Sequence, residues 1–270
     1  MLLFYGNQLL TWFREKIMLG MKKLAAILAG AGLLASGAAQ ATLLDRGGGL
    51  IYDDVLNITW LKDANYAKTS GYDADGQMNW SAANAWAASL SYFDSVRGVD
   101  ITGWRLPRTL PVNGVGYTSF VGYSGNSDIG YNVSAIGSAY PGSTASELAY
   151  MFYIDLGNTG QRSVAGATIG CSPLCLTNVG PFINIQSYQY WSLTEYTGNS
   201  YGGGNYAWIL DMQDGFQGAY VQSWGNYAWA VHDGDVAAAG AVPEPMSLAL
   251  LGAGLAGLAL GRRRRPLGAS

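Results

Sequence analysis

The sequence has 270 residues and a formal net charge of −3 at pH 7, and 49% of its residues are hydrophobic. The charge is unevenly distributed, because residues 42–245 contain seven basic and 17 acidic side chains, a net charge of −10. An acidic surface of this kind disfavours binding to nucleic acid and to strongly anionic polymers. Nucleic acid is therefore not among the expected partners.

Residues 1–41 are predicted to be a targeting segment. Residues 21–23 (Met-Lys-Lys) are basic, residues 24–34 are apolar, and Ala39 and Ala41 form an A-x-A cleavage site. This order is typical of a secretory signal peptide. We expect translation to start at the methionine of the basic stretch and the exported protein to begin near Thr42. A buried core helix is the alternative for the apolar run.

Residues 42–240 are expected to form one domain with a sizeable core. Its first elements are two strands, 50–53 and 58–61, in which β-branched and aromatic residues alternate with turn formers. The domain contains eight of the nine tryptophans, together with abundant glycine, serine and asparagine. Most of the tryptophans are expected to fill the core.

The stretch DADGQMN precedes a predicted helix from about Ser81 to Tyr92, for which Asn79 or Ser81 would be the N-cap. Asp73, Asp75, Gln77 and Asn79 stand at every second position, as the oxygen ligands of a calcium loop do, and Asp73, Asp75 and Asn79 are the candidate ligands. The glutamate that completes an EF-hand is missing. The alternative is a polar turn ahead of the helix, so we expect weak Ca²⁺ binding or none, and no other cofactor.

The segment GWRLPR, residues 103–108, is predicted to be extended and to be stopped by Pro107. Arg105 lies between Trp104 and Leu106, so its side chain alternates in direction with theirs. A partly buried guanidinium needs a carboxylate or carbonyl partner. We favour a structural clamp at Arg105 over a ligand contact.

Residues 110–142 are predicted to be a long loop rich in glycine, serine and asparagine. We expect it to project beside the glycine-rich stretch 198–204 and to bind neutral sugar rings, because its aromatic faces can stack on them. Removal of residues 112–140 is then expected to leave the domain folded. A disordered or self-packed loop is the alternative. The candidate sugar-stacking residues of the loop are Tyr117, Tyr123, Tyr131 and Tyr140.

A second helix is predicted to run to about Ile154. Thr144 and Glu147 have the spacing of a capping box at its start. Cys171 and Cys175, the only cysteines, are expected to form a local disulfide in an oxidising compartment. A metal-binding or catalytic thiol pair is the alternative for them.

Beyond residue 180, polar and apolar residues alternate along the chain, as they do in β-strands. The stretch YWSLTEY, which includes Trp191, Ser192, Thr194 and Glu195, is expected to form a buried strand-and-turn network, and a ligand site is the alternative. GNYAW occurs twice, at 204–208 and 225–229, and the two copies are predicted to begin neighbouring antiparallel strands. Trp224, between them, is a further candidate for sugar stacking, although core packing is the favoured role for it.

The tail has three parts in a fixed order. Pro243, Glu244 and Pro245 are followed by 16 uncharged residues, 246–261, and then by Arg262, Arg263, Arg264 and Arg265. As a helix the uncharged run would be about 24 Å long, against about 30 Å for the hydrocarbon core of a bilayer. This length suits transient anchoring in the inner membrane, with the arginines on the cytoplasmic side. A solvated charge run is the alternative for the arginines.

This tail resembles the PEP-CTERM sorting signal of Gram-negative bacteria. The resemblance implies recognition by an exosortase, which is a membrane cysteine protease, and cleavage near Pro-Glu-Pro. It also implies delivery to the cell surface or to the extracellular polysaccharide. The two prolines keep the cleavage region extended, which suits binding in a protease cleft.

The domain resembles a second family through MNWSAANAWAASL, GWRLPR, ELAYMFY, YWSLTEY, YAWILDMQDG and YAWAVHDGDV, which occur in that order. The family includes the C-terminal domain of bacterial collagen-like adhesins and is similar to C-type-lectin-like proteins. The resemblance implies an α+β domain with two helices, twisted antiparallel sheets, termini close together and long loops on one side. The chain differs from the family in the insert 110–142 and in His232, where the family often has arginine.

These observations favour an exported, non-enzymatic protein of the cell surface or matrix that binds extracellular polysaccharide. His232 is the only histidine, and neither Gly-x-Ser-x-Gly nor His-Glu-x-x-His occurs. A structural matrix protein without a sugar site is the second hypothesis. An enzyme that acts on the matrix is the third.

Overall fold

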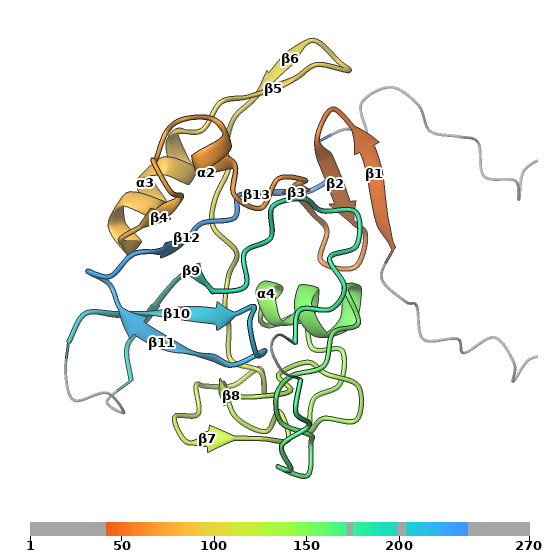
Figure 1. Cartoon of the computed structure of the whole chain (residues 1–270), viewed down its shortest axis with the longest axis vertical. Coiled ribbons are helices and arrows are strands. Elements are labelled where there is room, and N and C mark those ends of the chain that lie inside the picture. The colour runs from red at the N-terminus through yellow and green to blue at the C-terminus, as the bar shows by residue number, and fades with distance from the viewer. Residues whose placement is uncertain (1–41, 172–174, 199–203, 237–270) are drawn as a thin grey trace, which may run out of the picture. The chain divides into compact units, whose positions relative to one another are not determined.

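The computed structural model describes residues 42–171, 175–198 and 204–236 (Figure 1). The predicted signal peptide and the whole tail, 237–270, lie outside the described residues, as does most of the glycine-rich stretch 198–204. Within the described part of the chain, no helix is both long enough and apolar enough to span a membrane.

The first sheet joins the beginning of the domain to its end. Strands β2 (Leu50–Asp53) and β3 (Ile58–Leu61) have the predicted bounds, and β1 (Leu43–Gly47) and β13 (Val231–Asp233) pair on their outer sides. The strand order is β1-β2-β3-β13, and every pair is antiparallel. An ion pair between Arg46 and Asp235 ties the same two ends together. The two ends of the domain therefore lie close together.

Two short elements, α2 (Tyr66–Thr69) and β4 (Gln77–Met78), lead to the longest helix, α3 (Trp80–Ser89). Asn79 is its N-cap, because the Asn79 side chain accepts a hydrogen bond from the backbone N–H of Ala82. Ser81, the other candidate cap, lies inside the helix. The predicted C-terminal end is wrong, because α3 stops at Ser89 and Tyr92 begins a strand.

Tertiary contacts of Tyr92 account for the early end of α3. Its hydroxyl donates to the carbonyl of Gly48, 2.8 Å away, and its ring contacts Tyr66 and Trp104. Strands β5 (Tyr92–Asp94) and β6 (Val99–Ile101) form a separate two-stranded hairpin, which extends at the top of Figure 1.

The second sheet has seven strands in the order β4-β12-β9-β10-β11-β8-β7. Most of its pairs are antiparallel, and β12–β9 and β7–β8 are parallel. Figure 1 shows β9, β10 and β11 beside one another. The strands not yet introduced are β7 (Val121–Gly122), β8 (Ile129–Gly130), β9 (Gln189–Tyr196), β10 (Tyr206–Asp211), β11 (Gln217–Val221) and β12 (Asn226–Tyr227).

The prediction for the repeated GNYAW is wrong. The first copy begins β10 and the second contains β12, but these strands lie on opposite sides of β9. β10 pairs with β9 in the antiparallel direction and β12 pairs with it in the parallel direction. The intervening residues 217–221 form β11, which occupies the free edge of β10. The chain must therefore return to the other edge of β9 before β12 can pair.

The second predicted helix consists of α4 (Glu147–Tyr150) and a π-helical turn, η1 (Met151–Asp155). The capping box is wrong, because Ser146 and not Thr144 accepts the hydrogen bond from the backbone N–H of Ala149. The carboxylate of Glu147 points instead to Arg105, 2.7 Å away. Ser146 therefore caps the helix, and the Glu147 side chain forms an ion pair with Arg105 in place of the predicted capping-box bond.

The core is built largely from aromatic side chains. The fully buried tryptophans are Trp60, Trp86, Trp191, Trp208 and Trp229, and Trp104 is 2% exposed. The Trp191 indole N–H donates to the carbonyl of Met78, and that of Trp229 donates to the carbonyl of Leu61. Most of the tryptophans therefore fill the core, as predicted.

The insert 110–142 is a packed part of the fold and not a removable loop. It contributes β7, β8 and several core side chains, namely Val112, Ile129, Val133 and Ala135. The carboxylate of Asp128 is fully buried and accepts hydrogen bonds from the backbone N–H groups of Val112 and Thr118. This corrects the expectation that residues 112–140 can be removed, and it agrees with the self-packed alternative. The domain is a mixed fold, mostly sheet with few helices.

Candidate functional site

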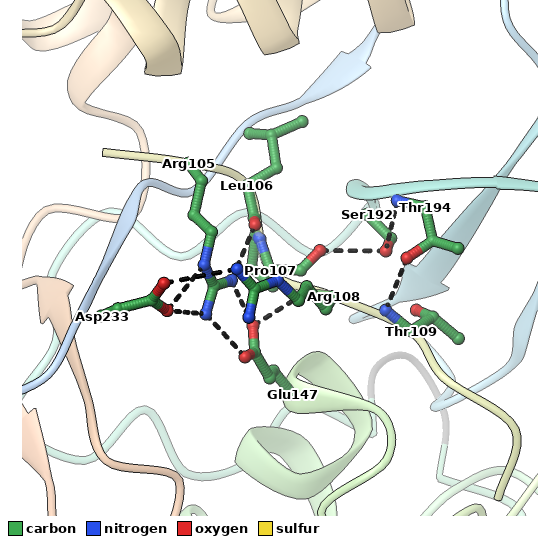
Figure 2. A network of polar contacts seen from close by, with 9 residues as sticks. All are labelled: Arg105, Leu106, Pro107, Arg108, Thr109, Glu147, Ser192, Thr194 and Asp233. Carbon is green, nitrogen blue, oxygen red and sulfur yellow. Dashed lines mark hydrogen bonds and ion pairs between the residues drawn. The ribbon is translucent and has the colours of Figure 1, made fainter. Parts of the chain in front are cut away.

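Arg105 joins three separate parts of the chain. Its backbone pairs with Val231, while its guanidinium reaches Glu147 on α4 and Asp233 on β13 (Figure 2). The two terminal nitrogens lie 2.7 and 2.8 Å from the two Glu147 oxygens, and the side chains of both residues are 11% exposed. The hydrogen bonds from Arg105 also lower the pKa of Asp233. Arg105 has the carboxylate partners that its burial requires.

Neighbouring groups extend this network to β9. The carbonyl of Pro107 accepts hydrogen bonds from the hydroxyl of Ser192 and the backbone N–H of Leu193, at 2.9 and 2.7 Å. The Thr194 hydroxyl accepts one from the backbone N–H of Thr109 (Figure 2). Because these groups satisfy one another inside the domain, the network positions the second sheet and leaves little room for a ligand.

Glu195 does not belong to this buried network, contrary to the prediction for the YWSLTEY stretch. Its side chain is exposed, and its carboxylate accepts a hydrogen bond from the Gln222 side chain at 3.3 Å. The position along β9 accounts for the difference, because Trp191 and Ser192 lie in the buried middle of the strand whereas Glu195 lies near its end.

The calcium-loop residues have local structural roles. Asp73 accepts hydrogen bonds from the backbone N–H groups of Asp75 and Gly76, and Asp75 accepts one from Gln77. Asn79 caps α3. Among the residues that the structure describes, no group of three or more His, Cys, Asp or Glu side chains could hold a metal ion. Cys171 and Cys175 are joined by a disulfide.

His232, the only histidine, lies on β13 beside Trp104, with 5.7 Å between the ring centroids. Its Nδ1 lies 2.6 Å from the carbonyl oxygen of Asp233. Within the described residues, no serine hydroxyl is hydrogen-bonded to this histidine.

The four candidate tyrosines of the insert do not form one cluster. Tyr123 and Tyr131 stack, with centroids 6.2 Å apart and ring planes at 23°. Tyr117 packs on Trp208 and donates its hydroxyl to the carbonyl of Thr109, so it holds the insert against the core. Tyr140 is exposed and makes no ring contact with another described aromatic residue.

A groove of about 440 Å³ lies along β10 and β11, and Val121 of the insert borders it. Phe216 lines the groove, and its ring lies close to the backbone of Gly218, because a Cβ atom at Gly218 would come within 2.5 Å of that ring. The other lining residues bring aromatic, aliphatic and amide groups together. They are Gln189, Tyr206, Ile209, Ala219, Tyr220 and Val221.

Aromatic contacts continue from both ends of the groove. At one end Phe216 contacts Tyr131, with 5.3 Å between centroids, and Tyr131 stacks on Tyr123. At the other end Tyr220 contacts Trp224, with 5.5 Å between centroids. The structure thus places these five residues, called here the aromatic row, in two contacting sets, Tyr123–Tyr131–Phe216 at one end of the groove and Tyr220–Trp224 at the other.

Trp224 is 57% exposed and not buried, contrary to the role favoured for it. Phe216 and Tyr220 were not predicted as site residues. The sequence signal for them is the concentration of aromatic residues in FQGAYVQSW, because Phe216 and Trp224 lie outside β11 and strand alternation therefore does not place the three rings on one face.

A second hollow, of about 370 Å³, shares Val221 with the groove. We call it the polar hollow, because uncharged polar residues form the rest of its lining. They are Asn79, Ser81, Asn205, Gln222 and Ser223.

Two carboxylates are buried together away from the groove. Asp53 is fully buried at the end of β2, and Asp155 at the end of η1 faces it. Burial first, and then the charge of Asp53, raise the pKa of Asp155 to about 9. This pair is well suited to holding one proton between two carboxyl groups at neutral pH.

Residues 241–265 match the family model of the PEP-CTERM protein-sorting motif. The motif is recognised by exosortase and indicates an exported protein that is sorted to the cell envelope or surface. No curated protein and no solved structure matches the chain.

Proposed function

We propose that this exported protein is a non-enzymatic binder of extracellular polysaccharide, and that the groove along β10 and β11 is its binding site. The observation that carries the proposal is the groove itself, which has contacting aromatic rings at each of its two ends, from Tyr123 to Phe216 and from Tyr220 to Trp224. Flat, partly exposed rings beside amide and hydroxyl groups suit sugar rings, which present C–H faces and hydroxyl edges. Sorting to the cell surface brings the groove into contact with such polymers.

The affinity of one groove is expected to be low. By analogy with other aromatic contacts, each stacked ring contributes about 1 kcal/mol, and part of this offsets the loss of motion on binding. Firm adhesion then depends on many copies of the protein that bind one polymer. A low-affinity, multivalent contact suits a matrix component better than it suits an enzyme.

Two features support a C-type-lectin-like fold as part of the same proposal. The first and last strands of the domain share one sheet, and long irregular segments connect the strands of the other. After cleavage near Pro243–Pro245 we expect exosortase to release the domain from transient anchoring in the inner membrane.

A structural matrix protein without a sugar site is the competing function. Its support is that some rings of the row already contact each other, as Tyr131 does with Phe216. The two functions differ in the role of the exposed rings. In a structural protein these rings contribute little, whereas in a binder their removal abolishes retention by polysaccharide.

The test is sedimentation of the full chain with insoluble polysaccharide from the matrix of the bacterium that makes it. A variant with Tyr123→Ala and Trp224→Ala is expected to bind at least tenfold more weakly, because both side chains are exposed and their loss spares the core. The matched control carries Tyr72→Ala and Phe93→Ala, which remove two exposed rings elsewhere. Absence of binding by the unmodified chain, or equal loss in both variants, would refute the proposal.

A further inference from the structure

The polar hollow offers hydrogen-bonding groups that the fold does not use. The Asn79 side chain caps α3 with its oxygen, so its amide nitrogen is left to donate. The side chains of Ser81, Asn205 and Ser223 are exposed and make no hydrogen bond to another described residue. Gln222 differs, because its amide donates to the carbonyl of Tyr206 and to Glu195 and is thereby fixed in place.

The hollow is also held on rigid elements. The backbone N–H of Trp80, at the start of α3, donates to the carbonyl of Gln222, and the N–H of Gln222 donates to the carbonyl of Asn205. The start of the helix and the residues that flank β10 and β11 are therefore joined by main-chain bonds. Fixed donors and acceptors lose little freedom when a ligand binds.

Neither the groove nor the polar hollow has a charged side chain in its lining. Charged groups occur only beside them, as Glu195 does near Gln222 and as Asp214 and Arg162 do near Tyr131 and Tyr123. Residues 42–245 carry a net charge of −10, so an anionic chain would be repelled as it approached. Uncharged polar and aromatic linings are complementary to an uncharged chain of sugars.

Length favours a ligand of several rings. Strand β11 has five residues and is therefore about 17 Å long at about 3.4 Å per residue, and the groove runs along it to Val221, where the polar hollow begins. One sugar ring covers only a part of this distance. A single chain can reach both hollows only by crossing β11 near Val221.

We infer that the polar hollow is a second sugar subsite, and that it and the groove hold successive rings of one uncharged glycan chain. The inference rests on the proposed polysaccharide binding and adds the class of polymer and the residues that select it. Rings stack on the aromatic row, and hydroxyl groups at the Val221 end bond to Asn205 and the two serines.

The test uses native gels that contain the matrix polysaccharide after anion exchange has separated it into uncharged and acidic fractions. Retardation of the full chain by the uncharged fraction is expected, with at least fivefold weaker retardation for Asn205→Ala and for the pair Ser81→Ala and Ser223→Ala. The matched control is the pair Ser91→Ala and Ser95→Ala, two exposed serines near the β5–β6 hairpin, which should behave as the unmodified chain does.

The possible results separate this inference from the proposed function. If the acidic fraction retards the chain more strongly, or if the hollow variants are retarded normally while Tyr123→Ala with Trp224→Ala is impaired, polysaccharide binding stands and the subsite is wrong. If neither fraction retards the unmodified chain, the proposed function fails and this inference fails with it.

Discussion

Replacement of Asp155 by asparagine is expected to stabilise the protein above pH 5. Both carboxylate oxygens of Asp155 are buried without a hydrogen-bond donor, and the facing Asp53 already accepts hydrogen bonds from the backbone N–H groups of Val55 and Leu56. One proton between the two carboxyl groups removes their repulsion. An asparagine amide at position 155 supplies the same donor at every pH.

The direction of this pH dependence follows from the pKa of Asp155, which is about 9 in the folded protein against 3.8 for an ordinary aspartate. The folded state binds the proton more tightly than the unfolded state does, so its stabilising contribution is complete below pH 4 and is lost as the pH rises toward 9. The free energy of unfolding falls by up to about 1.4 kcal/mol per pH unit in this window. Between pH 5 and pH 7 the upper limit is therefore about 3 kcal/mol for the Asp155–Asp53 pair.

Urea unfolding followed by tryptophan fluorescence, at intervals between pH 5 and pH 8, measures this effect. The quantity to compare is the difference between the unmodified chain and Asp155→Asn, because other carboxylates, such as Asp233, titrate in both proteins. Asp100→Asn, which changes an exposed carboxylate on β6 that does not contribute to the raised pKa of Asp155, is the matched control. The reasoning is refuted if the difference does not change with pH, or if Asp155→Asn is the less stable protein at pH 8.

Three further predictions concern the clamp, the insert and the tail. Arg105→Ala should lower the free energy of unfolding by about 3–5 kcal/mol in urea titrations, because Glu147 would remain buried without its partner; a loss below 1 kcal/mol would contradict the clamp. Deletion of residues 112–140 should abolish cooperative unfolding and resistance to proteolysis, because it removes core side chains; a folded product would show that the insert is dispensable. Replacement of Glu244, or of the cluster Arg262–Arg265, should leave uncleaved precursor in the inner-membrane fraction on immunoblots, and normal surface delivery of both variants would argue against sorting through this tail.

Elements that depend on neighbouring residues were predictable from the sequence. The strands 50–53 and 58–61 follow from local alternation of side chains, and the cap at Asn79 follows from its position before an apolar run. The extended segment around Pro107 follows from the restricted backbone of proline. Each of these signals acts within a few residues, so no knowledge of the rest of the fold was needed.

Features that depend on distant contacts could not be predicted in this way. The helix α3 ends before Tyr92 because the Tyr92 hydroxyl donates a hydrogen bond to the carbonyl of Gly48, 44 residues earlier. The Glu147 side chain pairs with Arg105, 42 residues away, and does not form the predicted capping-box bond. The strands that contain the two identical GNYAW copies, β10 and β12, do not pair with each other because they lie on opposite sides of β9. In each case a tertiary contact overrides a local preference.

The candidate site was predictable only in part. The aromatic character of the insert was evident, but only Tyr123 and Tyr131 join the row, while Tyr117 is used to anchor the insert. Phe216, Tyr220 and Trp224 are close together in the sequence, but no strand period places them on one face. Their meeting with the insert depends on β8 pairing with β11, which no local pattern specifies.

The position of β13 determines how a tethered domain would carry mechanical load. A pull on the chain that follows Val236 enters the fold at β13, which is held by β3 on one side and by the backbone of Arg105 on the other. The force then divides between the first sheet and the Arg105–Glu147 ion pair and does not pass first through β10 or β11. If a polymer binds the proposed groove while the tail is held, β13 and the Arg105 clamp therefore lie on the load path between the anchor and the binding surface.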